Sequence, residues 1–429
     1  MTGTDHTISP EKVVLVGVIH PGMVRETVTE HLDELELLAR TAGAEVVGRF
    51  IQKRERIDPR YFVGKGKAGE IVQKAQLLDT HTVIFDDELS PSQVRNFLKL
   101  TSNLKVIDRT GLILDIFMKH ARSREAKTQV ELAQLQYLLP RLTRRWTHLE
   151  RQMGGIGTRA GMGETQIEVD RRLIRDRIAT LRRDLDRIER ERETQSKRRR
   201  EVFRVALVGY TNSGKSTLMN ALTGSEVFVE DQLFATLDTT VRSLDLNSAH
   251  RVLLSDSVGF IRKLPHTLVA SFKSTLKEVL ESDLLVVLLD ASSPHMEDHL
   301  RTVREVLADI GAHKKESLTV INKVDLIDDP AIIQAYRSRF PHAIFISALN
   351  HLRLDSLQDA IVRAMDASFR TATVVLPPAS SREISSVYDQ VEVLETRYEK
   401  DGVYLKIRGN RANVDRIKAL SRNGSPAKG

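Results

Sequence analysis

Eight consecutive residues have the types and spacing that hold a phosphate group. Residues 209–216 read GYTNSGKS and fit the pattern GxxxxGK[ST], between an apolar run and a helical run at 217–223. The glycines let successive backbone amides turn towards a phosphate, and the N-terminus of the following helix adds partial positive charge. We expect Lys215 to reach the β- and γ-phosphates of a nucleotide and Ser216 to ligate Mg²⁺.

A second motif indicates which base the nucleotide carries. Residues 322–325 read NKVD after an apolar run. The Asp325 carboxylate can accept hydrogen bonds from N1–H and the exocyclic amine of guanine, whereas adenine offers no such donor pair. We expect Asn322 to brace the loop and contact N7, and the stem of Lys323 to cover the base. The backbone amides of residues 347–349, which follow the next apolar run, can face O6 of guanine.

Two further segments have the composition of γ-phosphate sensors. In DSVG, residues 256–259, Asp256 is suited to hold Mg²⁺ through water, and the amide of Gly259 can contact the γ-phosphate. Residues 234–240 supply three candidate threonine ligands for Mg²⁺, which are Thr236, Thr239 and Thr240, and spacing does not separate them. The motif order predicts two switch segments that GTP orders and hydrolysis releases.

The residue after Gly259 is Phe260, where many such enzymes place a glutamine that orients the attacking water. Phenylalanine cannot hydrogen-bond water, so we expect slow hydrolysis unless another group assists. Asn212, inside the phosphate loop, could ligate a monovalent cation such as K⁺, or it could only stabilise the loop backbone. Both interpretations remain open.

The elements that must position these motifs form a doubly wound parallel sheet. Apolar runs at residues 203–208, 251–255, 284–290, 318–321 and 343–346 predict its strands, and ligands of such sheets lie at the carboxyl ends of the strands. We assign residues 201–370 to this domain. A small α/β domain with a mostly parallel sheet is predicted at 1–119, from apolar runs at 12–18, 45–52, 82–85 and 104–107 and a helix at 24–42.

The N-terminal domain contains a second glycine-rich stretch, GKGKAG at residues 64–69, with Asp86 twenty residues after Gly66. This resembles a dinucleotide-binding fingerprint, but the preceding apolar run is only residues 61–63 and is not the first strand of its domain. A basic turn that contacts phosphates or a simple surface loop explains the stretch better, and the surface loop is the favoured interpretation.

Residues 120–200 predict a basic antiparallel helical hairpin. Apolar residues repeat at steps of three and four from Leu132 to Leu149, through Trp146, and again from Ile167 to Ile188, and Pro140 should interrupt the first helix. Residues 153–165 contain five glycines and cannot form a regular helix. Residues 119–200 hold 22 basic and 12 acidic residues, an excess of ten within a chain whose net charge is +7.

The rest of the chain predicts a small α+β domain at residues 371–429, with strands at 391–398 and 403–408 around Asp401-Gly402, a helix at 411–421 and a disordered tail. The chain of 429 residues has no cysteine, no apolar run of membrane-spanning length and no apparent secretory signal. We therefore expect a cytoplasmic protein with no membrane anchor and no disulfide, and we expect a monomer.

Long stretches of the chain resemble the HflX family of translation-associated GTPases. They read YFVGKGK at 61–67, KVIDRTGLILDIF at 105–117, REAKTQVELAQLQYLLPRLTR at 124–144, WTHLERQ at 146–152, GGIGTRAGMGETQIEVDRR at 154–172, GYTNSGKSTLMNAL at 209–222, FATLD at 234–238, DSVGFI at 256–261 and NKVD at 322–325.

The resemblance implies a GTPase that binds the large ribosomal subunit and its rRNA, acts on stalled or idle ribosomes, favours separation of the subunits and has no DNA partner. It implies that the hairpin tip approaches the peptidyl transferase centre, that Phe260 is a family feature, and that ribosomes stimulate hydrolysis. The tip residues expected to contact RNA are Gly154, Gly155, Ile156, Gly157, Thr158, Arg159, Gly161 and Gly163. One departure is Met162, which stands where the family usually has proline and should loosen the tip.

The resemblance also selects Thr236 as the threonine that ligates Mg²⁺. Candidate catalytic residues are then Lys215, Thr236, Gly259 and Asn212, and the candidate metal ligands are Ser216, Thr236 and, through water, Asp256. The full set expected at the nucleotide is Gly209, Tyr210, Thr211, Asn212, Ser213, Gly214, Lys215, Ser216, Phe234, Ala235, Thr236, Leu237, Asp238, Asp256, Ser257, Val258, Gly259, Asn322, Lys323, Val324, Asp325, Ser347, Ala348 and Leu349. The alternative function is a K⁺-dependent GTPase that acts on another RNA, for example in tRNA modification, or that regulates a protein partner.

Overall fold

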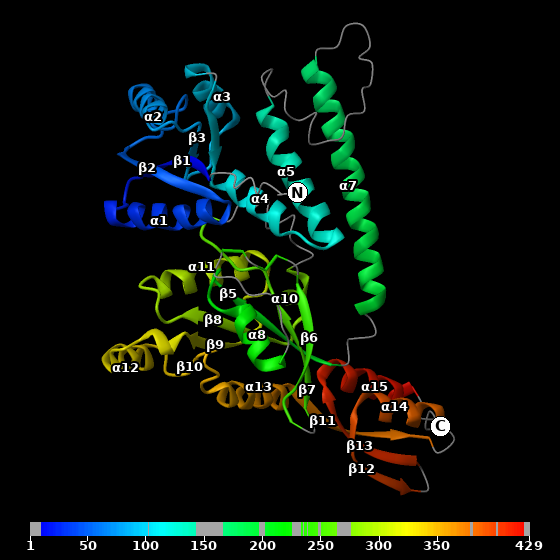
Figure 1. Ribbon diagram of the computed structural model, residues 1–429. Helices are drawn as coiled ribbons and strands as arrows, with labels where there is room; N and C mark the ends of the chain where they lie inside the picture. Colours follow the sequence, from blue (N-terminus) through cyan, green and yellow to red (C-terminus); the bar gives the residue numbers. More distant parts are fainter. Residues whose placement is uncertain are drawn as a thin grey trace, which may run out of the picture. The chain divides into compact units, whose positions relative to one another are not determined.

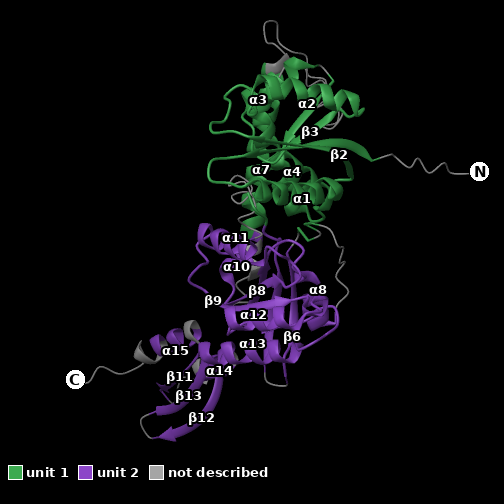
Figure 2. Ribbon diagram, turned by 90° about the vertical axis from the view of Figure 1, so that its left-hand side faces the viewer, with its two compact units in different colours: residues 1–190, 229–238, 261–275 green, residues 191–228, 239–260, 276–429 purple. Residues whose placement is uncertain are grey.

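The chain divides into two compact units, coloured separately in Figure 2. Unit 1 is residues 1–190 with the short segments 229–238 and 261–275, and unit 2 is residues 191–228, 239–260 and 276–429. The computed structural model describes residues 10–101, 103–142, 166–196, 202–224, 233–234, 236–237, 239–247, 250–263, 276–377, 381–399 and 402–423.

Unit 1 begins with a wholly parallel four-stranded sheet in the order β2-β1-β3-β4 (Figure 1). Its strands are β1 (Glu11–Ile19), β2 (Ala44–Lys53), β3 (Thr82–Phe85) and β4 (Lys105–Asp108), and its helices are α1 (Arg25–Thr41), α2 (Lys65–Leu77), α3 (Pro91–Leu100) and α4 (Arg109–His120). The predicted small α/β domain is confirmed. Local signals set its helix ends: at the start of α3, Ser90 caps the helix and forms a capping box with Gln93, and Pro91 is the first helical residue.

The second glycine-rich stretch folds differently from either interpretation offered for it. Gly64 caps α2 at a φ of 91°, and Gly66 and Gly69 lie inside that helix. Residues 61–63 form no strand, because only an isolated bridge joins Phe62 to Asp58. The expectation of a surface loop was therefore wrong, and the strand–turn–helix geometry that a dinucleotide fingerprint requires is not present in this described part of the chain.

The helical hairpin is formed by α5 (Arg124–Leu138) and α7 (Gln166–Ser196), which lie side by side in Figure 1. Leu132, Leu135, Leu142, Ile174, Ile178 and Leu181 form its buried seam, with Leu139 and Leu185 at the edge. As expected, the first helix ends before Pro140, which lies in a 3₁₀ turn, η1 (Leu139–Arg141). Arg177 joins the helices by donating twice to the Glu131 carboxylate, at 2.6 and 2.8 Å. Trp146, Leu149 and the tip lie outside the described residues.

Unit 2 is built on a six-stranded sheet in the order β10-β9-β8-β5-β7-β6. The strands β5 (Phe203–Gly209), β7 (Arg251–Asp256), β8 (Leu284–Asp290), β9 (Glu316–Asn322) and β10 (Ile344–Phe345) are parallel, as predicted. The sequence did not predict β6 (Thr240–Asp245), which pairs antiparallel with β7 at the edge and makes the sheet mixed. The helices are α8 (Lys215–Thr223), α10 (Lys277–Glu281), α11 (Met296–Asp309), α12 (Pro330–Arg339) and α13 (Leu354–Ser368), with a 3₁₀ turn η3 (Val324–Leu326).

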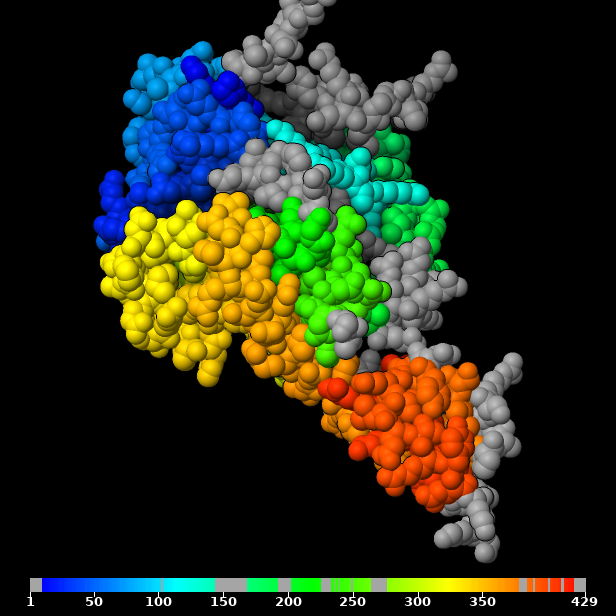
Figure 3. All heavy atoms as spheres, turned by 60° about the horizontal axis from the view of Figure 1, so that its bottom comes forward, coloured from blue at the N-terminus to red at the C-terminus, as the bar shows by residue number. Residues whose placement is uncertain are grey.

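The C-terminal part of unit 2 is a small antiparallel sheet with two helices, packed together in orange to red in Figure 3. The sheet order is β11-β13-β12, with β11 (Phe369–Leu376), β12 (Glu392–Glu399) and β13 (Gly402–Asn410), and the helices are α14 (Ser381–Gln390) and α15 (Arg411–Asn423). The predicted hairpin and final helix are present, while β11 begins before the boundary placed at residue 371. Among the described residues, no helix is both long and apolar enough to cross a membrane.

Candidate nucleotide site

The predicted phosphate loop lies between the end of β5 and the start of α8, at the carboxyl edge of the sheet. Its glycines are required by space. A Cβ on Gly209 would lie 2.5 Å from the backbone oxygen of Leu288, and one on Gly214, whose φ is 90°, would collide with the side-chain nitrogen of Asn322. The loop thus approaches its neighbours so closely that a side chain at either glycine would not fit.

Lys215 is the first residue of α8 and is buried. Its ammonium donates to the backbone oxygens of Tyr210 at 2.8 Å and Gly209 at 3.3 Å. Burial lowers the pKa of Lys215 to about 8; the charge of Asp256 opposes this shift and that of Lys323 adds to it. A buried cation with only carbonyl acceptors is poorly neutralised, so a phosphate group would be a favourable partner for it.

Two side chains with oxygen atoms that could ligate Mg²⁺ lie next to Lys215. The Ser216 hydroxyl donates to Oδ2 of Asp256 at 2.6 Å, and Asp256 is completely buried at the end of β7. A hydroxyl and a carboxylate are the hard oxygen ligands that Mg²⁺ prefers, directly or through its water shell. The pair therefore fits the metal role predicted for it. Among the described residues, no group of three or more acidic or histidine side chains could hold a metal ion without the nucleotide.

The segment after Asp256 runs close to the phosphate loop. A Cβ on Gly259 would lie 2.7 Å from Cα of Thr211 and 3.1 Å from Nζ of Lys215, so the backbone of Gly259 faces the ammonium closely. Phe260 is joined to the loop through its backbone: its amide donates to Gly209 at 3.0 Å, and its carbonyl accepts from Thr211 at 2.7 Å. The Phe260 side chain is buried, which agrees with a packing role and not with orientation of water.

The guanine motif forms one hydrogen-bonded unit with the phosphate loop. Asn322 donates from Nδ2 to the backbone oxygen of Ser213 at 3.0 Å and accepts at Oδ1 from the amide of Ala348 at 2.9 Å. It therefore braces the phosphate loop, as predicted, and it also holds the loop at residues 347–349. Oδ1 of Asp325 is buried and has no hydrogen-bond partner among the described residues. A buried carboxylate oxygen without a donor is unfavourable alone, and guanine offers the missing donors.

Four contacts at this site were not predicted. The ammonium of Lys323 pairs with Asp290 at 2.7 Å, which positions its stem from the end of β8. The ring of Tyr210 stacks on His299 of α11, with centroids 3.8 Å apart and planes 11° apart. The amide of Ala348, expected to face O6 of guanine, donates to Asn322 in this structure, and the amide of Ser347 donates to the carbonyl of Leu352. Sequence position alone signals only the Asp290 contact, because that aspartate ends the neighbouring strand.

The remaining predicted residues lie elsewhere or outside the described part of the chain. Asn212 is exposed and has a φ of 60°. Phe234, Thr236 and Leu237 belong to unit 1, while Ala235 and Asp238 are outside the described residues. The predicted RNA-contacting tip, Gly154 to Gly163, is also outside them. Unit 2 thus brings together the phosphate loop, the Asp256 segment, the guanine motif and residues 347–349.

Family models match the chain along most of its length. The models are described as GTP-binding GTPase N-terminal at residues 29–118, GTP-binding GTPase Middle Region at 120–199 and 50S ribosome-binding GTPase at 204–323. The GTPase HflX of Flavobacterium psychrophilum is 54% identical over 319 residues, 74% of this chain and 76% of its own. The GTPase HflX of Escherichia coli is 44% identical over 404 residues, 93% of each chain. The chain belongs to the HflX family of GTPases.

This HflX-family chain is accordingly a GTPase, which hydrolyses GTP to GDP and phosphate and uses Mg²⁺ with the nucleotide. Its fold has the expected arrangement, a P-loop GTPase domain after an N-terminal α/β domain and a helical hairpin and before a small C-terminal domain. Among solved structures, a GTP-binding protein from the archaeon Sulfolobus solfataricus in complex with GDP aligns with 82% of this chain and 98% of its own at 25% identity, with a TM-score of 0.42. The family assignment rests on the relatives named above.

Proposed function

We propose that this GTPase is a GTP-gated factor that binds the large ribosomal subunit and its rRNA, and promotes subunit separation or rescue of stalled ribosomes in the cytoplasm. The observation that carries the proposal is the match of residues 204–323 to a model described as a 50S ribosome-binding GTPase, on a chain 93% covered by an HflX relative. The proposal keeps the division into four domains at 1–119, 120–200, 201–370 and 371–429, with the last boundary moved back to Phe369, where β11 begins.

In this proposal the nucleotide site works as a switch. Lys215 and the loop amides hold the β- and γ-phosphates, Ser216 and Thr236 ligate Mg²⁺, and Asp256 holds it through water. Asp325 reads guanine and Gly259 reports the γ-phosphate. Since the buried Phe260 cannot orient water, basal hydrolysis is slow, and ribosome binding supplies the stimulus. Asn212 is exposed. Measuring GTP hydrolysis in Na⁺ instead of K⁺ tests whether a K⁺ ion bound there contributes to the reaction.

The hairpin is the proposed RNA-binding element, and its charge is uneven. The described helix α7 carries nine arginines and eight acidic residues, so it is almost neutral. Outside α7 the excess is nine, of which residues 119–142 contribute three, residues 143–165 two and residues 197–200 four. Positive charge spread over these segments suits contact with rRNA phosphates, and such binding weakens with salt.

Co-sedimentation with purified large subunits tests this function. We expect binding with a non-hydrolysable GTP analogue, weaker binding with GDP, and a steep loss between about 50 and 200 mM salt. Arg159→Ala, at the tip, should reduce binding, and Arg187→Ala, on the nearly neutral α7, is the matched control. Binding that is equal with both nucleotides would contradict the gating. Absence of binding at low salt would favour the alternative, another RNA or a protein partner.

A further inference from the structure

A histidine that belongs to none of the nucleotide-binding motifs contacts the phosphate loop. His299 lies near the start of α11, and its ring stacks on the ring of Tyr210, the second residue of the loop. The ring centroids are 3.8 Å apart and the ring planes are 11° apart, so the two rings lie face to face. Both residues belong to unit 2. The motifs therefore leave one side-chain contact of the loop unexplained.

The backbone of Tyr210 connects two parts of the site that are expected to hold phosphate. Its carbonyl accepts a hydrogen bond from the Lys215 ammonium at 2.8 Å. On either side of it, the carbonyl of Gly209 accepts from the amide of Phe260 at 3.0 Å, and the amide of Thr211 donates to the carbonyl of Phe260 at 2.7 Å. Tyr210 and Phe260 thus form a parallel bridge beyond the end of β5. A displacement of Tyr210 would move both Lys215 and the Phe260 segment.

The loop contains a strained residue directly after this part. Asn212 has a φ of 60°, and a residue other than glycine keeps such a conformation only where its surroundings hold it. On one side of Asn212, Nδ2 of Asn322 donates to the carbonyl of Ser213 at 3.0 Å. On the other side, the Tyr210 side chain is 5% exposed and lies against His299. The strained residue is therefore held between two contacts, and only the first belongs to a motif.

The helix α11 gives His299 a firm base. Three apolar residues of this helix are buried, Met296, Leu300 and Val303. The helix packs against β5, which leads into the phosphate loop, and against β8 (Figure 1). A side chain near the end of a helix that is packed into the sheet has little freedom to move. The imidazole ring therefore offers Tyr210 a fixed surface.

We propose that His299 is a positioning residue that braces the phosphate loop through Tyr210, on the side of the loop opposite to the Asn322 brace. The inference rests on the assignment of the nucleotide site. Because the stack orders the loop before the nucleotide arrives, less conformational freedom is lost on binding. The Tyr210 carbonyl then holds the Lys215 ammonium in place for the β-phosphate, which GDP and GTP share. His299 acts through Tyr210 and not by contact with the nucleotide.

Equilibrium titration of the full-length chain with GDP and with a non-hydrolysable GTP analogue tests this brace. His299→Leu keeps an apolar side chain at the position and removes the planar ring. It should weaken the binding of both nucleotides about three- to tenfold, the effect of losing one stacked aromatic pair. His299→Phe restores a planar ring, so its affinities should lie within about twofold of the wild-type values.

Two further measurements connect the effect to the stack. In a Tyr210→Leu background, His299→Leu should weaken binding no further, because the stack is already lost. At saturating GTP the bound phosphates order the loop again. The kcat of His299→Leu should therefore stay within about twofold of the wild-type value, while KM rises in proportion to the loss of affinity.

The matched control is His313→Leu, which replaces an exposed histidine of the same unit and should bind as the wild type does. Unchanged affinity in His299→Leu, or failure of His299→Phe to restore it, overturns the proposal. Fewer binding sites per chain at an unchanged Kd would also overturn it, because they would show a loss of folded protein only. Normal nucleotide binding by Lys215→Ala would instead refute the nucleotide site itself, so the two failures are distinguishable.

Discussion

Two glycine-rich stretches each lead into a helix that begins with lysine, yet only one of them forms a crowded loop. At residues 209–216, a Cβ on Gly209 or Gly214 would collide with Leu288 or Asn322. At residues 64–69, a Cβ on Gly66 or Gly69 would meet nothing within 4 Å, and both glycines lie inside α2. Lys215 is buried with carbonyl partners, whereas Lys65 is exposed. A glycine-rich stretch therefore indicates a phosphate loop only where neighbouring atoms leave no space for side chains at its glycines.

The carboxyl ends of the parallel strands in the two sheets differ in the same way. In unit 2 the carboxyl edge carries a loop of backbone amides and a carboxylate oxygen without a donor, which is an arrangement that needs a ligand. In unit 1 the carboxyl edge is filled by Asp86, Arg109 and Lys263, whose charges satisfy each other. One sheet end is built to receive a nucleotide, while the other is already occupied by the chain itself.

The largest effect that tests this comparison is expected from Lys215→Ala. Removal of the buried ammonium leaves phosphate oxygens without their cation, so affinity for GTP and GDP should fall more than about 100-fold. Fluorescent-nucleotide titration measures the loss. Lys65→Ala, the corresponding lysine of the N-terminal stretch, is the control and should bind as the wild type does. Equal behaviour of the two variants would contradict the assignment of the phosphate loop.

Asp325→Asn should have the next largest effect and should change specificity. Replacing the carboxylate by an amide removes the double acceptor for guanine, so GTP affinity should fall about 100-fold while xanthine nucleotides gain relative to GTP. Competition binding with GTP and XTP measures this change. Asp328→Asn, three residues later and exposed, provides the control. Equal losses for both nucleotides would show that Asp325 only supports the fold of its loop.

Gly214→Ala should act through backbone strain and collision. The φ of 90° and the proximity of Asn322 should destabilise the loop by about 1–3 kcal/mol and weaken nucleotide binding roughly tenfold or more. Thermal unfolding, with and without GDP, separates the two effects. A variant with normal stability and normal GDP binding would mean that the loop can accommodate a side chain at residue 214, which would contradict the collision with Asn322.

The smallest effect is expected from Gly66→Ala, which should raise the stability of the chain, whereas Gly214→Ala should lower it. Gly66 lies in α2 with free space around it, so alanine should stabilise the chain by about 0.5–1 kcal/mol and leave nucleotide binding unchanged. Chemical unfolding of the variant beside the wild type gives the comparison. Weakened GTP binding in this variant would revive a nucleotide role for the N-terminal stretch.

The sequence predicted those parts of the fold that rest on local patterns. Apolar runs located the parallel strands of both sheets, and the phosphate loop and guanine motif lie at the predicted strand ends. The edge strand β6 was missed because only Leu244 among its six residues is buried, so it shows no apolar run. The predicted domain boundary at residue 371 falls inside β11. This strand begins directly after the last residue of α13, so no loop residues mark the boundary in the sequence.

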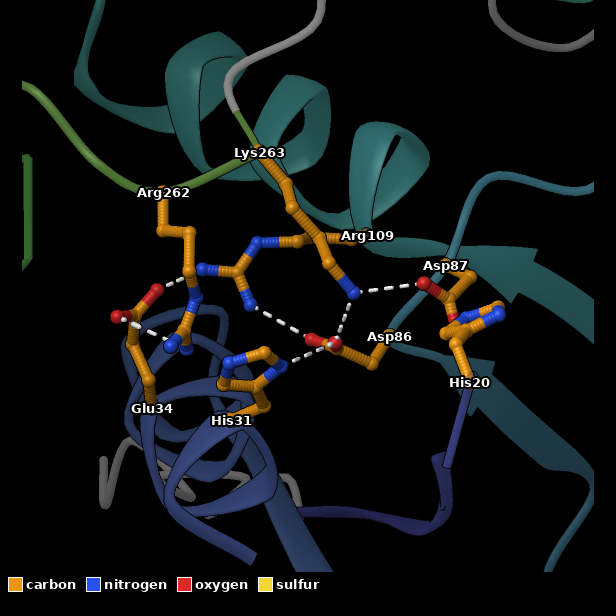
Figure 4. A network of polar contacts seen from close by, with 8 residues as sticks. All are labelled: His20, His31, Glu34, Asp86, Asp87, Arg109, Arg262 and Lys263. Atoms are coloured by element: carbon orange, nitrogen blue, oxygen red, sulfur yellow. Dashed lines mark hydrogen bonds and ion pairs between the residues drawn. The ribbon is translucent and has the colours of Figure 1, made fainter. Parts of the chain in front are cut away.

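The ion pairs at the carboxyl end of the N-terminal sheet could not be predicted, because Asp86, Arg109 and Lys263 lie far apart in the sequence with no local spacing (Figure 4). Asp86 was noticed only as the partner of a dinucleotide fingerprint, and the structure places it against Arg109 and Lys263 instead. The contacts of Phe234 with His120 and Phe117 also join distant parts of the sequence. Long-range ionic contacts leave no periodic signal in a single sequence, whereas strands and phosphate loops do.

We propose that the large ribosomal subunit activates this GTPase. The most direct test is steady-state GTP turnover in K⁺ buffer, with and without purified large ribosomal subunits, at a salt concentration that permits binding. We expect slow turnover of the chain alone and strong stimulation by large subunits, and we expect both to be abolished in Lys215→Ala. Turnover that is slow and unchanged by large subunits would leave the GTPase in place and contradict its activation by the ribosome.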